Sequence, residues 1–194
     1  MRVSARFAVV APTARERARP LPGDDLVPEA VQMDRAFTLP APPDQVWPWL
    51  VQLGKDRGGW YLPRSVERYL PPARRAVRRV VPELQHLAVG DTIPDWGGRE
   101  ATLTLVAQDR HRYLLHASRR GSVSFTWALV LTREGRAGTR VQSRVRLGPV
   151  KYEWLAERVG GALDLISLLG LAHGLRERVT TDYRRAHDPG GPYR

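Results

Sequence analysis

The segment PDQVWPWLVQLGKDRGGWY, residues 43–61, joins a short apolar helical pattern to a tight glycine turn. Its apolar side chains at helical spacing fall on one face: Val46, Trp47, Leu50 and Val51. A proline suits the first turn of a helix and a glycine suits its end, so Pro43 and Gly54 delimit the helix. The double glycine that follows permits a sharp turn, which carries Trp60 and Tyr61 toward another part of the molecule.

An alternating segment comes just before this helix. From Gln32 to Leu39, apolar and polar side chains alternate in the pattern of a strand, and Pro40 ends the pattern. Asp34 and Arg35 lie on this strand. Arg35 shares a face with the apolar side chains and is therefore a candidate anchor for an anion inside a cavity, although such an arginine more often lies at the end of a sheet.

Residues from about 100 onward show strand and turn patterns. Strands are expected over 101–107, 112–118, 122–132 and 139–147, with a hairpin turn at 133–138. The last strand alternates apolar side chains with Arg140, Gln142, Arg144 and Arg146. This pattern predicts an antiparallel meander with one face in water.

The C-terminal part is helical. Apolar side chains recur at helical spacing between Gly161 and Ala186, which predicts a helix about 40 Å long. Gly170 and Gly174 would let one side of this helix approach a neighbour closely. With a second short helix expected near residues 63–70, the pattern predicts an α+β fold: a curved antiparallel sheet wrapped around a long C-terminal helix, with two short helices closing one end.

Length and composition favour one soluble domain. The chain has 194 residues, and we divide it into a flexible N-terminal arm (1–21), a single ligand-binding domain (22–187) and a tail (188–194). The absence of cysteine excludes disulfides, thiolate catalysis and cysteine-ligated metals. The apolar runs are too short for a secretory signal or a membrane span, so we expect a cytoplasmic protein.

The formal net charge is +11, and nearly all of the basic residues are arginine. This charge favours either an anionic partner or simply a GC-rich coding sequence. Four arginines would form one basic stripe if residues 71–82 were helical: Arg74, Arg75, Arg78 and Arg79. Such a stripe would suit an acidic membrane or nucleic acid, although we expect no specific nucleic acid partner.

Several segments, in this order, resemble one known family. They are MDRAFTLPAPPDQVWPWLVQLG, the following GGWY, VPELQHLAVGDTIP, FTWALVL and LAHGLRERV. Together they are similar to the SRPBCC, or START-like, superfamily, which includes polyketide cyclase/dehydrase and lipid-transport proteins, and the chain looks closest to uncharacterised bacterial members. The resemblance covers about residues 22–186 and implies a helix-grip fold with a deep, mostly apolar cavity. The chain departs from similar proteins at Leu62–Arg64 and in the short loop DWGGR (95–99), both near the expected cavity entrance.

The candidate ligand-binding residues are aromatic: Trp47, Trp60, Tyr61, Trp96, Tyr113, Phe125 and Trp127. Aromatic rings with polar ends provide apolar area together with one directed hydrogen bond. Trp47 has a competing interpretation as plain core packing. Phe125 and Trp127 face either the core or the cavity, which in a hollow fold are nearly the same surface.

Titratable candidates are few. His116 lies on a strand whose inward face the alternation leaves open, and Asp164 could cap the helix, pair with an arginine or act chemically. No metal-binding pattern, phosphate loop or serine nucleophile elbow is present, so we expect no metal and no cofactor.

Three functions remain open. The first is non-catalytic binding of an apolar or amphipathic small molecule, and the second is a polyketide cyclase/dehydrase or aromatase type of enzyme using the same cavity. The third is an arginine-rich interaction module. The enzyme requires an inward titratable group near the aromatic cluster, whereas the binder requires only a closed apolar cavity.

Overall fold

The computed structural model of the chain describes residues 10–28, 30–98 and 100–187. Within them, the strands are β1 (Val31–Leu39), β2 (Thr92–Pro94), β3 (Thr102–Asp109), β4 (Tyr113–Arg120), β5 (Val123–Glu134) and β6 (Gly138–Gly148). The α-helices are α1 (Ala14–Ala18), α2 (Pro43–Val51), α3 (Arg64–Glu67), α4 (Glu153–Leu155) and α5 (Gly161–His187). Shorter helical turns are η1 (Pro72–Arg74), η2 (Pro82–Leu84) and the π-helical η3 (Ala156–Gly160).

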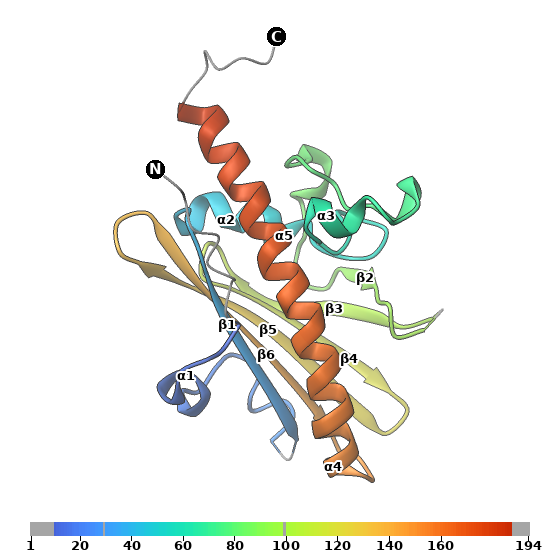
Figure 1. Cartoon of the computed structure of the whole chain (residues 1–194). Coiled ribbons are helices and arrows are strands. Elements are labelled where there is room, and N and C mark those ends of the chain that lie inside the picture. Colours follow the sequence, from blue (N-terminus) through green and yellow to red (C-terminus); the bar gives the residue numbers. More distant parts are fainter. Residues whose placement is uncertain (1–9, 29, 99, 188–194) are drawn as a thin grey trace.

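The described strands form one antiparallel sheet in the order β1-β6-β5-β4-β3-β2. The sheet curves around α5, which crosses it diagonally, while α2 and α3 lie toward one end of the sheet (Figure 1). We call the face of the sheet toward α5 the concave face and the other the convex face. The arrangement confirms the predicted α+β helix-grip fold.

The concave face carries the core. Register pairs such as Phe37 with Val141 and Trp127 with Val145 place apolar side chains of neighbouring strands side by side on this face. From α5, the fully buried Leu171 and Leu175 belong to the same cluster. Each such side chain stabilises the fold by about 1.5–3 kcal/mol when it leaves water, so the regular alternation in the sequence is enough to fix the sheet against the helix.

Glycines in α5 allow a close contact, as the sequence predicted. A Cβ atom added at Gly174 would lie 2.4 Å from the carbonyl carbon and oxygen of Tyr61, and one at Gly170 would lie 2.6 Å from the side chain of Leu62. The neighbour that the helix approaches is therefore the segment just after the glycine turn. This contact holds Trp60 and Tyr61 against α5.

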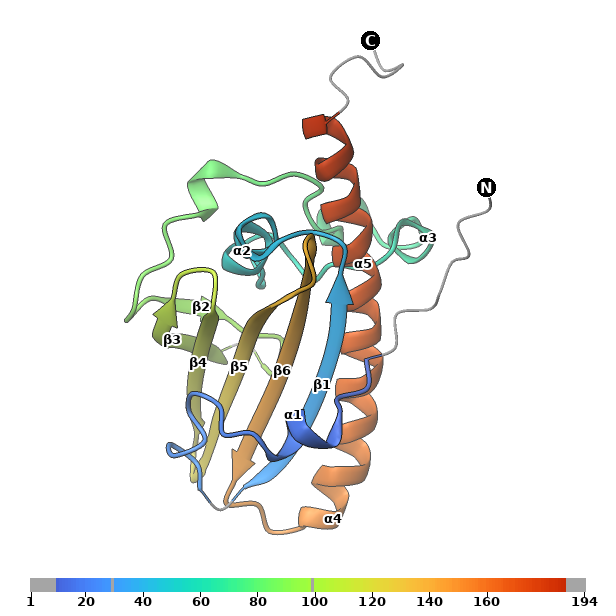
Figure 2. The same ribbon diagram turned by 90° about the vertical axis from the view of Figure 1, so that its left-hand side faces the viewer.

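The convex face is covered in part, whereas the sequence predicted a face in water: Gln142 and Arg144 of β6 are buried, while Thr102 and Thr132 are exposed. Residues 10–28, including α1, run across it, so that α1 and α5 lie on opposite sides of the sheet (Figure 2). Residues 10–21 had been expected to belong to a flexible arm, but they are packed here; residues 1–9 and the expected tail, 188–194, lie outside the described residues. A polar alternation in a strand indicates a polar environment, and it does not tell water from a polar covering segment.

Arg144 fixes this covering segment. Its side chain is 3 % exposed, and it forms ion pairs with Asp34 (2.8 Å) and Asp24 (2.7 Å). It also donates to backbone carbonyl oxygens in the covering segment, those of Glu16, Arg17 and Arg19. The charged strand residue thus replaces water with carboxylates and carbonyls of the N-terminal segment.

Residues 71–82 do not form the basic helix that was one interpretation of the sequence. Their only helical turn is η1, and η2 begins at the last of them, Pro82. Arg78 is instead paired with Glu67 and Glu177, and the nearby Arg178 of α5 pairs with Glu67 at 2.7 Å. Prolines at both ends of the segment limit helix formation, and the ion pairs use one arginine of the expected stripe to attach the segment to α5.

Candidate functional site

A cavity of about 510 Å³ lies between the concave face and the first half of α5. Its lining comes from the sheet, from α5, and from the loops after α2 and β2: Met33, Trp60, Asp95, Trp96, Leu103, Phe125, Trp127, Val145, Leu163, Asp164, Ser167 and Leu168. Most of these side chains are apolar, and the volume is within the range that small-molecule pockets occupy.

Tryptophan rings form one wall of the cavity. The centroid of Trp60 lies 5.6 Å from that of Trp96 in an edge-to-face contact, and 5.9 Å from that of Trp127. The indole nitrogens of two rings are engaged, because Trp60 donates to the backbone oxygen of Ser167 (3.1 Å) and Trp127 donates to Ser143 Oγ (3.0 Å). Their orientation is therefore set by the fold, whereas Trp96 is 51 % exposed and lies at the cavity's outer side.

The turn at Gly58 and Gly59 positions Trp60 in this wall of the cavity. Gly59 has a positive φ of 80°, and a Cβ atom there would lie 2.9 Å from Ala76. At Gly58 an added Cβ would lie 2.6 Å from the backbone oxygen of Gln52. Only glycine fits this tight return of the chain, which explains the GG pair in the sequence.

Four of the seven predicted ligand-binding residues line the cavity: Trp60, Trp96, Phe125 and Trp127. Trp47 is buried in the core, where its ring is perpendicular to that of His111 with the ring centroids 5.9 Å apart, in line with the competing interpretation as core packing. Tyr61 is fully buried, and its hydroxyl donates to the backbone oxygen of Trp49. Tyr113 is on the convex face, because the alternation of β4 places it opposite His116.

Asp164 brings charge into the apolar lining. Its Oδ2 lies 3.0 Å from Nε of Arg35, which also donates to the backbone oxygens of Gly161 and Asp34. Burial raises the pKa of Asp164 to about 6; the Arg35 charge opposes this shift and the Asp34 charge adds to it. Of the alternatives that the sequence left open, the structure therefore supports pairing with an arginine.

Arg35 is held by this pair and by backbone oxygens, and it is not among the residues that line the cavity. The sequence could place Arg35 on the inward face of its strand. The sequence could not show that Asp164, which is far away in the chain, would form an ion pair with the guanidinium group of Arg35.

The inward face of β4 includes His116, which settles the ambiguity of the sequence. His116 is 3 % exposed and its ring lies 5.7 Å from that of Trp127, but it is not part of the cavity lining. Neither ring nitrogen has a hydrogen-bond partner among the described residues. Burial, with a smaller effect of the Arg57 charge, lowers the pKa of His116 to about 4, so the ring is neutral at pH 7.

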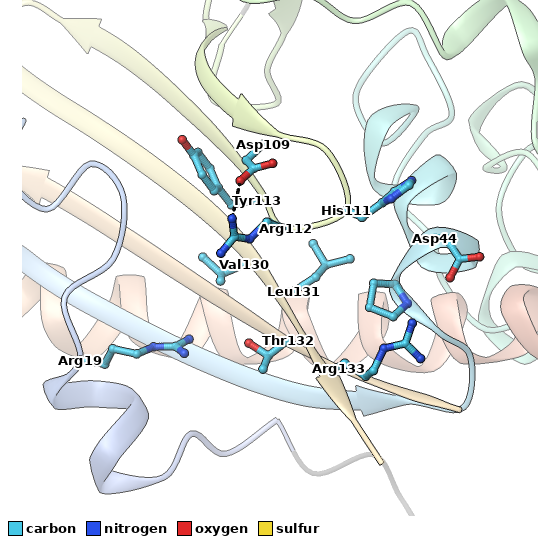
Figure 3. A pocket seen from close by; sticks show the side chains of 11 residues that line it. Arg19, Asp44, Asp109, His111, Arg112, Tyr113, Val130, Leu131, Thr132 and Arg133 are labelled. Atoms are coloured by element: carbon cyan, nitrogen blue, oxygen red, sulfur yellow. Dashed lines mark hydrogen bonds and ion pairs between the residues drawn. The ribbon is translucent and has the colours of Figure 1, made fainter. Parts of the chain in front are cut away.

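A second concavity, of about 830 Å³, lies near Tyr113 at the end of the sheet where α2 begins. Its charged side chains have both signs: Arg19, Asp44, Asp109, Arg112 and Arg133. Figure 3 shows Arg112 turned toward Asp109, with which it pairs at 3.0 Å, while Arg19 and Arg133 stand apart from them. The charges do not converge on one point, so the smaller, apolar cavity is the better candidate for a functional site.

Comparisons with known proteins give fold likeness only. Neither a family model nor a curated protein matches the chain. Among solved structures, the protein MLL2253 of Mesorhizobium loti is 13 % identical, with a TM-score of 0.49 over 77 % of this chain and 97 % of that one. CalU16 of Micromonospora echinospora is 17 % identical, with a TM-score of 0.44 over 87 % of this chain and 90 % of that one.

A third solved structure is described as a polyketide_cyc-like protein, Cgl2372 of Corynebacterium glutamicum. It is 11 % identical, with a TM-score of 0.40 over 86 % of this chain and 99 % of that one. At this level of similarity no activity transfers to the chain, and the function has to be argued from the cavity itself.

Two further observations bear on the classes of function. Among the described residues, no group of three or more His, Asp or Glu side chains is placed to hold a metal ion. In the same part of the chain, no helix has the length and apolar character needed to cross a membrane.

Proposed function

We propose that this protein binds an apolar or amphipathic small molecule in the cavity between the concave face and α5. The observation that carries this proposal is the aromatic wall, where Trp60, Trp96 and Trp127 meet in one apolar lining although they come from three separate segments. Removing a ligand's apolar surface from water favours binding by roughly 25 cal/mol per Å². The indole rings of Trp60 and Trp127 are already held by hydrogen bonds, so they add little ordering cost when the ligand arrives.

An enzyme is a second candidate, because one observation favours it. The cavity contains a titratable group, Asp164, whose pKa is raised by burial to about 6, close to neutral pH. A carboxyl group with such a pKa can both accept and donate a proton near neutral pH. No comparable observation favours the arginine-rich module, because Arg78 is used in ion pairs and Arg75 donates to backbone oxygens.

Filling the cavity tests the binding proposal. Val145→Phe adds a ring to the lining, and we expect it to weaken binding of 1-decanol, followed by tryptophan fluorescence, by about tenfold or more, or about 1.4 kcal/mol. The matched control is Val130→Phe, which adds the same ring at the outer concavity. If Val145→Phe binds 1-decanol as tightly as the wild-type protein while both variants remain folded, the ligand does not occupy this cavity.

A further inference from the structure

The charge of the cavity lining differs from that of the whole chain. The chain has a formal charge of +11, yet the described residues that line the cavity include two carboxylates and no lysine, arginine or histidine. Each carboxylate is paired with an arginine outside the lining, Asp164 with Arg35 and Asp95 with Arg120. An anionic ligand would therefore lose its own hydration without meeting a basic side chain in the lining. The lining disfavours fatty acids and other anionic amphiphiles, even though the surface of the protein attracts them.

The two carboxylates are not equivalent. Asp95 is already engaged, because Oδ2 pairs with Arg120 and Oδ1 accepts the backbone N–H of Trp96 at 2.7 Å. Asp164 has a side chain that is 9 % exposed; its Oδ2 is ion-paired with Arg35 Nε at 3.0 Å, and this oxygen accepts no hydrogen bond among the described residues. Asp164 is thus the buried carboxylate on which a ligand cation would act most strongly.

The aromatic wall favours the same kind of ligand. Faces of tryptophan rings attract cations, most strongly where water is excluded, and the cavity offers Trp60, Trp96 and Trp127 together with Phe125. A buried carboxylate beside several such rings is a chemical setting for an ammonium group attached to an apolar body.

We infer that the ligand of this cavity is an organic cation, with its ammonium group beside Asp164 and its apolar body against the tryptophan wall. This inference rests on the proposed binding function and adds the chemical class of the ligand. Preferred binding of a cation could not come from non-specific attraction, because the net positive charge of the protein attracts the opposite class, the anionic amphiphiles.

Three probes with the same tail test the inference: decyltrimethylammonium, 1-decanol and decyl sulfate, each below its micelle concentration. We expect the ammonium compound to bind about tenfold more tightly than 1-decanol at pH 8, and decyl sulfate to bind most weakly of the three in the cavity. Isothermal titration calorimetry gives the affinities, and competition with 1-decanol shows that the probes share one site. Equal affinities, or tightest binding of decyl sulfate, would overturn the cation inference and leave the proposed binding function intact.

The preference should depend on pH. Asp164 must be ionised to favour a cation, so the advantage of the ammonium probe is expected to shrink as the pH falls through about 6. The charged groups around Asp164 are Arg35 and Asp34 on β1, with Asp95 elsewhere on the cavity wall. A preference that is unchanged between pH 8 and pH 5 would contradict the role of Asp164.

Asp164→Asn provides the direct variant, and Asp109→Asn, at the outer concavity, is the matched control. Asp164→Asn leaves the Arg35 charge uncompensated, so we expect the order of affinity to reverse in favour of decyl sulfate, with 1-decanol binding retained. If Asp164→Asn does not fold, the pH series on the wild-type protein tests the role of Asp164 instead. If the folded wild-type protein binds none of the three probes, the proposed binding function itself fails.

Discussion

Single side chains show how this protein tolerates buried polar groups. Arg144 is surrounded by carboxylates and carbonyl oxygens, whereas His116 is buried with neither ring nitrogen hydrogen-bonded among the described residues. A buried charge is stabilised only by partners, while an imidazole can become neutral. The two residues should therefore respond to substitution in opposite ways.

Arg144→Ala should destabilise the protein strongly. The substitution leaves Asp34 buried without its ion pair and frees the N-terminal segment from the convex face, so we expect a loss of about 3–5 kcal/mol in the free energy of unfolding. Chemical denaturation measures this loss. Arg133→Ala, at an exposed position of β5, serves as the control, and similar stabilities for the two variants would show that the segment is not held by Arg144.

His116→Phe should be tolerated, and its effect should depend on pH. The folded pKa of about 4 lies below the ordinary value of 6.5, so wild-type stability attributable to this group is full above pH 6.5 and is lost as the pH falls toward 4. Relative to wild type, His116→Phe should therefore gain about 3 kcal/mol between pH 6.5 and pH 4.

At each pH, the free energy of unfolding of wild type is subtracted from that of His116→Phe. Asp164 is present in both proteins, so its contribution cancels and the difference reports on His116. The pKa of Asp164 is raised, so its own contribution changes in the opposite direction over the same range. The exposed His86 provides the control variant, His86→Phe. Parallel stability curves for His116→Phe and wild type would mean that the imidazole is not held neutral by the fold.

Among the elements, α5 determines both packing and site. Its middle, from Leu168 to Val179, packs against the sheet and against the segment after the glycine turn, and its first half contributes Leu163, Asp164 and Ser167 to the cavity. The helical spacing of leucines made this helix predictable. The segment that Gly170 and Gly174 approach was not predictable, because glycines in a helix indicate a close contact without indicating which part of the chain makes it.

Gly174→Ala tests this approach. The added methyl would lie 2.4 Å from backbone atoms of Tyr61, which cannot move aside as a side chain would, so we expect a loss of about 1–3 kcal/mol or more. Gly161→Ala is the control in the same helix, because an added Cβ there meets nothing within 4 Å. Thermal unfolding compares the two, and equal unfolding temperatures would argue against the tight contact between α5 and the glycine turn.

For the whole molecule, the sequence predicts the architecture better than the surroundings of each polar residue. Alternating strands and one long periodic helix determine a helix-grip fold, because each apolar face has only one partner available. The polar positions of β6 were expected in water, yet Gln142 and Arg144 are covered by the N-terminal segment. Residues 10–28 carry little periodicity, so the burial that they provide could not be inferred from the sequence.

The sequence also predicts part of the candidate site, namely its aromatic wall, but not its ion pair. The tryptophans around the cavity stand out in composition, and the turn glycines explain the position of Trp60. Trp47 and Tyr61 have the same residue types but are fixed in the core by the face of α2 and by the hydroxyl of Tyr61. The pairing of Asp164 with Arg35 joins distant parts of the chain, and no local pattern reveals it.

The indole N–H signals of the six tryptophans offer the most direct test of the cavity as a binding site. In a two-dimensional ¹H–¹⁵N NMR titration with 1-decanol, the signals of Trp60, Trp96 and Trp127 should shift together and saturate. Those of the core residues Trp47 and Trp49 and of the exposed Trp154 should change little. Saturating shifts confined to Trp154, or no shifts at all, would contradict the account.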